Sequence, residues 1–311
     1  MKYKHLVWLL FFVYFFFIIA FFSSVYKKNL RHEKNHVVCT TSMIGDIVQH
    51  IGGDHVSIHT LMGAGVDPHL YKPLENDIMQ IAQADVIFYN GLHLEAQMEH
   101  IFKHLATYKT TVAVTQDIEQ EKLISSFEYD NHYDPHVWFS VPLWIQAIKT
   151  VTQTLSLHDP EHTKEYQQNS ARYIQACKKT FQKTVTLLDS LPQEKRILIT
   201  GHDAFQYFAQ TYNFQVIGLQ GMSTESQVGS QDIQKLIDFI VENKVPAIFV
   251  ETSTPVRNIQ SLQEGVAERG FSVEIGGELF SDALGPIGTP EHSYLGMIES
   301  NVATIYHALM K

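Results

Sequence analysis

The sequence predicts an α/β fold in which two lobes of parallel sheet and helix are joined by one long rigid helix. After residue 35 the chain alternates short apolar runs with longer amphipathic runs. This alternation is typical of parallel sheets covered by helices on both faces. It is interrupted once, where the chain runs from Asp159-Pro160 to Asp189 without a further Gly or Pro. These residues, about 30 in number, would measure roughly 45 Å as a helix, which exceeds ordinary crossover helices and indicates a strut between two lobes.

The first lobe is expected to span residues 36–157. Its apolar runs predict strands at residues 36–42, 56–62, 85–90 and 110–114. The runs between and after them predict helices at residues 43–51, 75–82, 95–105 and 140–155. The last helix has a defined start, because Ser140 suits the N-cap and Pro142 suits the first turn.

The linking helix is expected within residues 158–190 and the second lobe within residues 191–311. Apolar runs in this lobe predict strands at residues 196–200, 214–219, 247–251 and 271–275. Amphipathic runs predict helices at residues 204–212, 232–243, 254–269 and 291–310. Thr254-Pro255 is an N-cap followed by proline, and Gly270 ends that helix.

The first 35 residues are expected to be a signal peptide or an uncleaved signal anchor. Residues 6–22 are apolar and carry no charge, with two lysines before them and four Lys or Arg residues after them. The run is slightly long for a signal peptide and slightly short for a membrane span. The excess of positive charge after the run favours the reverse orientation, with a cytoplasmic body. We favour export, with membrane contact through this segment if it is retained.

The composition excludes some classes of partner. The chain has a net charge of −10, with 45% hydrophobic and 18% charged residues. A nucleic-acid partner would require a basic face, so none is expected.

The two cysteines, Cys39 and Cys177, have no metal-binding spacing and cannot form a disulfide scaffold. We expect two buried free thiols, with a single disulfide between them as the alternative.

Asp-Pro-His occurs twice, at Asp67-Pro68-His69 and at Asp134-Pro135-His136. Proline fixes its own φ and pushes the preceding residue into an extended conformation. Each motif is therefore a stiff segment that presents a histidine. One interpretation is two surface turns with incidental histidines. The other is two histidines held toward one ligand.

Four metal-type side chains follow the ends of predicted strands. His69 and His136 lie in the first lobe, and His202 and Asp282 lie in the second. Ligands of parallel sheets bind beyond the carboxyl ends of the strands, so these four would share one edge. Three imidazoles and one carboxylate suit Zn²⁺ and are acceptable for Mn²⁺ or Fe²⁺. His202 could instead cap the next helix, and Glu278 competes with Asp282 for the acidic role.

Several motifs then indicate a family. They are "VDPHLYKP", "NGLHLE", "DPHVW", "GHDAFQYFA", "GLQGMSTES", "PAIFVETS" and "IGGELFSDALG". They resemble the metal-binding components of ABC importers for zinc, manganese or iron, of the TroA type, over nearly the whole chain after residue 36. The resemblance implies two lobes, one long helix, and one metal ion held in the cleft by His69, His136, His202 and Asp282.

The resemblance leaves the metal open. Manganese-selective members commonly have Glu where this chain has His202. Classical zinc-specific members carry a long His-rich loop between the first two ligands, whereas this chain has one extra histidine there, His132. Zn²⁺ and Mn²⁺ are both expected as cargo, with Fe²⁺ as a further possibility.

The resemblance also implies the job of the protein. It would capture one divalent metal ion in the periplasm or at the cell surface and deliver it to an ABC permease with its ATPase. We expect a monomer without enzymatic activity, whose lobes tilt slightly when the metal binds. The fixed long helix would resist a wide swing.

Other residues near the four ligands have two interpretations each. Tyr71, Trp138 and Phe205 could form a dry shell around the site or simply pack in the core. Glu251 could orient a ligand, or could belong to a cap or a core network. Three aspartates adjoin ligands and are expected to be turn formers first and orienting groups second. These are Asp67, Asp134 and Asp203.

Two rival functions use the same residues. A metallohydrolase could hold a catalytic zinc ion, but it would need an open coordination position and a general base. The chain has no HExxH motif and no Gly-x-Ser-x-Gly nucleophile elbow. A binding protein for a chelated metal would need a wide cleft lined with basic or aromatic groups.

Overall fold

The computed structural model describes residues 34–126, 132–225 and 229–311. The chain divides into two units, residues 1–35 and 36–311, and the fold below is that of the second unit. The expected signal segment lies almost wholly outside the described residues. Within the described ranges, no helix combines the length and the apolar character needed to cross a bilayer.

The N-terminal lobe is built on a four-stranded sheet with strand order β2-β1-β3-β4. Its strands are β1 (Asn35–Thr41), β2 (Val56–Met62), β3 (Val86–Tyr89) and β4 (Thr110–Ala113). The central strand β3 pairs in parallel with both β1 and β4. Alternate residues of β1 are buried on opposite faces, with Val37 and Cys39 in one cluster and Val38 in another. A strand buried on both faces reads as a continuous apolar run, which explains the run at residues 36–42.

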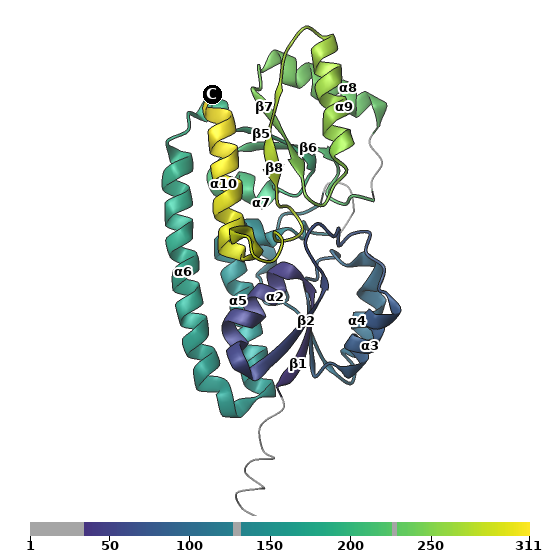
Figure 1. Ribbon diagram of the computed structural model, residues 1–311, viewed down its shortest axis with the longest axis vertical. Helices are drawn as coiled ribbons and strands as arrows, with labels where there is room; N and C mark the ends of the chain where they lie inside the picture. Colours follow the sequence, from purple (N-terminus) through teal and green to yellow (C-terminus); the bar gives the residue numbers. More distant parts are fainter. Residues whose placement is uncertain (1–33, 127–131, 226–228) are drawn as a thin grey trace, which may run out of the picture. The chain divides into compact units, whose positions relative to one another are not determined.

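Helices cover both faces of this sheet. The cluster of Val37 and Cys39 includes residues of α2 (Ser42–Gly52) and α5 (Val141–His158), and the cluster of Val38 includes residues of α3 (Glu75–Gln83) and α4 (Glu99–Leu105). Thr41 caps α2 by accepting the Ile44 N–H. The carboxyl ends of the strands point toward the second lobe (Figure 1).

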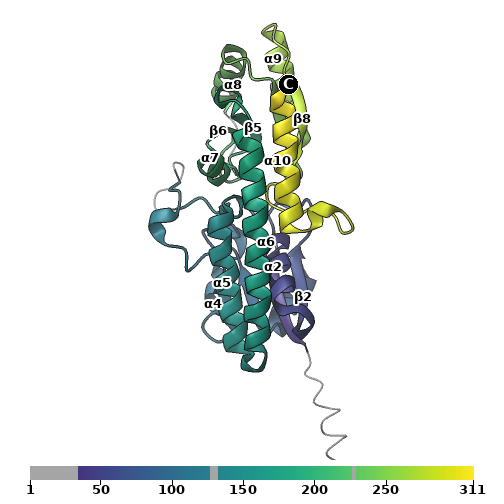
Figure 2. The same cartoon turned by 90° about the vertical axis from the view of Figure 1, so that its left-hand side faces the viewer.

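A single helix, α6 (Thr163–Asp189), runs along both lobes (Figures 1 and 2). It packs against α2 and α5 in the first lobe and against α10 (Tyr294–Met310) in the second. The α-helix begins three residues after the predicted Asp159-Pro160 start, because a 3₁₀ turn (Pro160–His162) precedes it. Cys39 and Cys177, in β1 and α6, are buried free thiols, as expected.

The C-terminal lobe contains two parallel strand pairs. The pairs are β5 (Ile197–His202) with β6 (Gln215–Gln220), and β7 (Ala247–Glu251) with β8 (Glu274–Leu279). Strands β5 and β7 lie side by side. Ile199 and Ile248 pack with α8 (Ser230–Glu242) and α9 (Val256–Glu268), and Leu198 and Phe249 pack in the cluster that contains α7 (Gln206–Tyr212) and α10.

The structure therefore confirms the predicted α/β fold with parallel sheets, two lobes and a long helix. The boundaries 36–157, 158–190 and 191–311 stay a prediction, because the second unit behaves as one compact body.

Among the elements whose bounds differ from the sequence prediction, two differ for a clear physical reason. The strand expected at residues 271–275 is β8, Glu274–Leu279, because Gly276 and Gly277 belong to the strand. A Cβ on Gly276 would stand 2.7 Å from Ala308 Cβ and 2.8 Å from the ring of Phe249, so glycine allows the close approach. The pair had indicated a strand end.

The helix expected at residues 95–105 begins later, with a 3₁₀ turn (Ala96–Met98) followed by α4. Glu95 is buried and its carboxylate faces inward. It accepts hydrogen bonds from the Asn90 and Gly91 N–H groups and from the Thr40 hydroxyl. This network fixes the chain before the helix can start.

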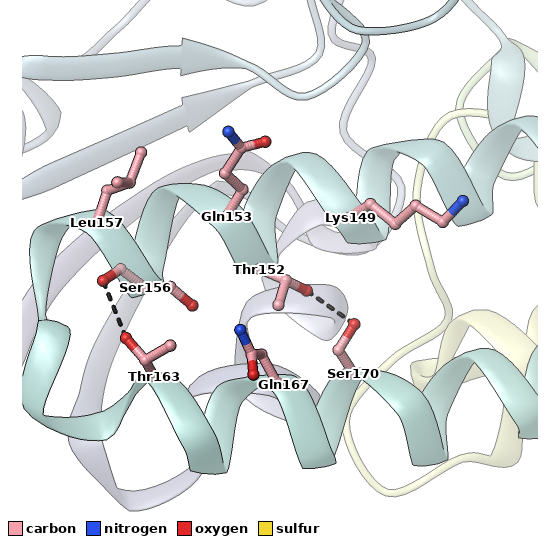
Figure 3. A pocket seen from close by; sticks show the side chains of 8 residues that line it. All are labelled: Lys149, Thr152, Gln153, Ser156, Leu157, Thr163, Gln167 and Ser170. Atoms are coloured by element: carbon pink, nitrogen blue, oxygen red, sulfur yellow. Dashed lines mark hydrogen bonds between the residues drawn. The ribbon is translucent and has the colours of Figure 1, made fainter.

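A shallow polar groove lies between α5 and α6 (Figure 3). Thr152 donates a hydrogen bond to Ser170 across it, and Thr163 donates to the Ser156 carbonyl. Its lining contains no His, Cys or carboxylate side chain, so it does not have the donors of a metal site.

The close packing at Gly276 generates a stability prediction. Gly276→Ala places a methyl group against Ala308 and Phe249, and overpacking of this kind costs about 1–3 kcal/mol. We expect a lower urea midpoint with an unchanged m-value. Gly63→Ala is the control, because nothing lies within 4 Å of a Cβ there. Equal stability of the two variants would contradict this account of β8.

Candidate metal centre

Four side chains converge where the lobes meet. His69, His136, His202 and Asp282 are buried, and each has a ligand-type atom within 4.8 Å of those of the other three. His69 lies in the loop after β2, His136 in the loop after β4, His202 at the end of β5, and Asp282 three residues after β8. The structure brings together the four residues that the sequence singled out. Glu278, the rival acid, is exposed in β8 and lies outside the group.

The separations between these donors suit a metal ion. His69 Nε2 lies 3.3 Å from His136 Nε2. Asp282 places Oδ1 3.4 Å from His136 Nε2 and Oδ2 3.3 Å from His202 Nε2. Ligands of a tetrahedral zinc ion with bonds near 2.0–2.1 Å are about 3.3 Å apart. The donors are therefore spaced as the corners of one small coordination sphere.

Two of these donors lack a hydrogen-bond partner. His202 Nε2 and Asp282 Oδ1 are buried side-chain atoms without one. Buried polar atoms are nearly always paired, and a cation between the four side chains would satisfy both. The chemistry of the set, three imidazoles and one carboxylate, fits a divalent transition metal.

The two Asp-Pro-His motifs share one local device. Asp67 Oδ1 accepts the His69 N–H at 2.9 Å, and Asp134 Oδ1 accepts the His136 N–H at 2.9 Å. Both aspartates are therefore turn formers, as expected. Asp134 also orients the ring, because its Oδ1 lies 2.7 Å from His136 Nδ1. The motif thus directs Nε2 of His136 toward the cleft.

His202 is fixed by a carboxylate from a different strand. Glu251 Oε1 accepts the His202 N–H at 2.9 Å, and Oε2 lies 2.6 Å from His202 Nδ1. Of the two interpretations of Glu251, the structure shows contact with a ligand. Asp203 behaves differently, because it accepts a hydrogen bond from the Gln206 amide.

Among the three aromatic residues, Trp138 contacts a ligand. Its ring meets that of His136 edge-on, with centroids 5.2 Å apart. Tyr71 instead donates to Asp77, and Phe205 stacks on Phe139. Trp138 also crosses between lobes: its Nε1 donates to the Ser281 carbonyl at 2.8 Å. This bond joins residues 143 positions apart in the sequence, and no local motif predicts it.

The side of the centre nearest His69 leads to a small surface cavity. Both lobes line this cavity, which includes His93 and His132, whose rings stack with centroids 4.7 Å apart. Two side-chain hydrogen bonds close the lobes nearby. Thr224 donates to Asp67 at 2.6 Å, and Gln97 donates to Glu225 at 2.8 Å. No sequence motif indicates these contacts.

The pKa values of the three imidazoles shift in different directions. Burial lowers the pKa of His69 to about 3. Burial also opposes the charged forms of His136 and His202, but nearby carboxylates outweigh it. Asp134 and Asp282 raise the pKa of His136 to about 9, and Glu251 and Asp282 raise the pKa of His202 well above its ordinary value.

The carboxylate at the centre shows the reverse effect. Burial alone would raise the pKa of Asp282, but His202 and His136 hold it well below its usual range. Asp282 and the charged forms of His136 and His202 therefore stabilise one another. A metal ion bound between these side chains would replace the protons of the two rings.

The chain is similar to known metal-binding proteins over most of its length. The profile of the family described as zinc-uptake complex component A, periplasmic, matches residues 37–308. Manganese-binding lipoprotein MntA of Bacillus subtilis is 43% identical over 276 residues, covering 88% of this chain and 89% of that protein. Zinc-binding protein TroA of Treponema pallidum is 44% identical over 275 residues, covering 88% and 89%.

Solved structures agree with the fold. The periplasmic zinc-binding protein TroA from Treponema pallidum superposes with a TM-score of 0.87 at 44% identity, covering 89% of this chain and 99% of that chain. A manganese-bound variant of a periplasmic metal-binding protein from Candidatus Liberibacter asiaticus gives 0.79 at 27% identity, covering 89% and 100%.

The bond from Trp138 to the other lobe generates a prediction. Trp138→Phe leaves the buried Ser281 carbonyl without its donor, which costs about 1–3 kcal/mol beyond the loss of packing. Trp144→Phe is the matched control, because Trp144 is equally buried and its Nε1 has no hydrogen-bond partner. Denaturant unfolding should show the larger loss of unfolding free energy for Trp138→Phe. The opposite order would contradict a stabilising role of the hydrogen bond from Trp138 to Ser281.

Proposed function

This chain belongs to the zinc-uptake complex component A family, and from that premise we propose that it captures a divalent transition-metal ion outside the cytoplasm and delivers it to an ABC importer. The observation that carries the proposal is the set of four buried donors, His69, His136, His202 and Asp282, spaced 3.3–3.4 Å apart along the three contacts that join them. These four residues hold the ion.

The cargo is Zn²⁺ or Mn²⁺, with Fe²⁺ as a further candidate. Relatives named for zinc and for manganese match this chain almost equally well. Imidazole donors bind Zn²⁺ more tightly than Mn²⁺ in solution, following the Irving–Williams order. Which ion the protein carries in the cell also depends on which ion is available there.

A binding role is favoured over catalysis. A catalytic zinc site keeps an open position for water or substrate, whereas four protein donors surround this centre. The adjacent carboxylates of Asp134 and Glu251 contact ligand rings, so neither is placed to act as a general base. These features support transport over a metallohydrolase, and the small buried centre does not suit a chelated metal.

The partner is an ABC permease with its ATPase, and the protein works as an exported monomer in the periplasm or at the cell surface. Residues 1–35 direct export and contact the membrane if they are retained. The lobes, residues 36–157 and 191–311, tilt only slightly about the helix at 158–190. Buried bonds across the lobes support the small tilt, namely Trp138 to Ser281 and Tyr207 to Asp134.

Metal content tests the proposed function directly. We expect the purified protein to hold about one equivalent of transition metal and the double variant His69→Ala/His202→Ala to hold none. Elemental analysis after incubation with zinc and manganese provides the measurement. The control is His100→Ala/His104→Ala, which removes two exposed histidines of α4. Equal metal in the parent and the cleft variant would rule out the four-ligand site.

Metal binding should also release protons. In the metal-free protein the raised pKa values of His136, about 9, and of His202 keep both rings protonated near neutral pH, and ligands must lose those protons. Affinity should therefore rise with pH, by up to about tenfold per unit for each displaced proton. His69 contributes nothing, because its pKa is about 3. Chelator competition across the neutral range measures the slope, and a flat profile would contradict the assignment.

A further inference from the structure

The carboxyl ends of β5 and β7 place a carboxylate directly behind one ligand. His202 ends β5 and Glu251 ends β7. The residue before His202 is Gly201, where a Cβ would stand 2.7 Å from Thr254 Oγ1 and 3.1 Å from Glu251 Oε1. A side chain at this position would therefore crowd Glu251. Glycine at position 201 therefore leaves room for the carboxylate of Glu251.

Glu251 contacts His202 with both of its oxygens. One oxygen accepts the backbone N–H at 2.9 Å, and the other lies 2.6 Å from ring Nδ1. The side chains of both residues are fully buried. A buried carboxylate needs donors, and among the described residues every hydrogen bond and ion pair of the Glu251 carboxylate goes to His202. The proton of the neutral ring must then sit on Nδ1, which leaves the Nε2 lone pair facing the cleft.

The three histidines differ in this support. His136 has a comparable partner, since Asp134 contacts both its backbone N–H and its Nδ1. Asp67 contacts the His69 N–H but gives its second oxygen to Thr224. Within the described ranges no carboxylate contacts Nδ1 of His69. The centre therefore has two imidazoles backed by a carboxylate and one that is not.

We propose that Glu251 is a positioning residue that sets the preference of the centre for zinc over manganese. The inference rests on the proposed function and names a determinant of its metal selectivity. A carboxylate that accepts the far N–H of a ligand histidine fixes the ring and makes Nε2 a stronger donor. Zn²⁺ gains more from a strong imidazole donor than Mn²⁺, which favours oxygen ligands. Loss of the carboxylate should therefore weaken zinc binding more than manganese binding.

The test compares dissociation constants for Zn²⁺ and Mn²⁺, each measured by chelator competition on the full chain. Removal of a partner behind a metal ligand typically costs 10–100-fold in affinity. For Glu251→Gln we expect a zinc dissociation constant about tenfold higher or more, with a smaller change for manganese. The ratio of the zinc dissociation constant to the manganese dissociation constant should therefore rise. In zinc-loaded protein with ¹⁵N-labelled histidine, the Nδ1–H resonance of His202 should shift in Glu251→Gln.

Glu95→Gln is the matched control. Glu95 is also a buried carboxylate with several donors, but it contacts none of the four ligands. This variant should lose stability while keeping the zinc-to-manganese ratio and the His202 resonance of the parent. A ratio that moves equally in both variants would reduce Glu251 to a general stabiliser and overturn the inference.

The outcomes separate the two proposals. If the parent binds zinc and Glu251→Gln binds both metals with parent affinity, the inference fails and the proposed function stands. Equal losses for zinc and manganese in Glu251→Gln also overturn the selectivity role. If the parent binds neither metal, the proposed function fails and the inference fails with it.

Discussion

The carboxylate of Asp282 meets one imidazole from each lobe, and the rest of the structure depends on this bridge. Oδ1 faces His136 and Oδ2 faces His202, while Ser253 donates to Oδ2. A charge buried this deeply is tolerated only with opposite charge and hydrogen bonds around it. The lobes supply both only when they are in register. The relative placement of the two lobes therefore affects how well the charges of Asp282, His136 and His202 are balanced.

Further residues hold the four side chains of the centre in place, first by direct contact and then through neighbouring residues. Asp134 and Glu251 hold the outer nitrogens of two rings. Trp138 reaches from beside His136 to the residue before Asp282, and Tyr294 in α10 donates to the Trp138 carbonyl. Each bond restricts a ligand whose displacement would leave a charge unpaired. Helix α6 then packs against helices of both lobes along its length.

Much of this could be predicted from the sequence, because the relevant signals are local. Apolar runs gave the strands, and the two Asp-Pro-His motifs indicated stiff segments that present histidines. The topology rule for parallel sheets placed His202 and Asp282 at the same edge. This much needed no knowledge of distant contacts.

The parts that escaped prediction depend on distant partners. Gly276 and Gly277 read as a strand end, because the need for close packing against Ala308 is visible only in three dimensions. Glutamate is a residue type that favours helices, so Glu95 was expected to begin one. Its hydrogen-bond donors include Thr40, which lies 55 positions away. The contact of Glu251 with His202 was one of two open interpretations, since strand adjacency decides it. Local patterns carry no information about such pairs.

The contacts between the lobes are unequal on the two sides of the centre. On one side the bonds involve fully buried aromatic side chains, such as Trp138 and Tyr207. On the side of His69, two hydrogen bonds near the surface join the lobes, from Thr224 and Gln97. Separation of the lobes would therefore break hydrogen bonds of buried aromatic side chains on the first side, but only hydrogen bonds near the surface on the side of His69.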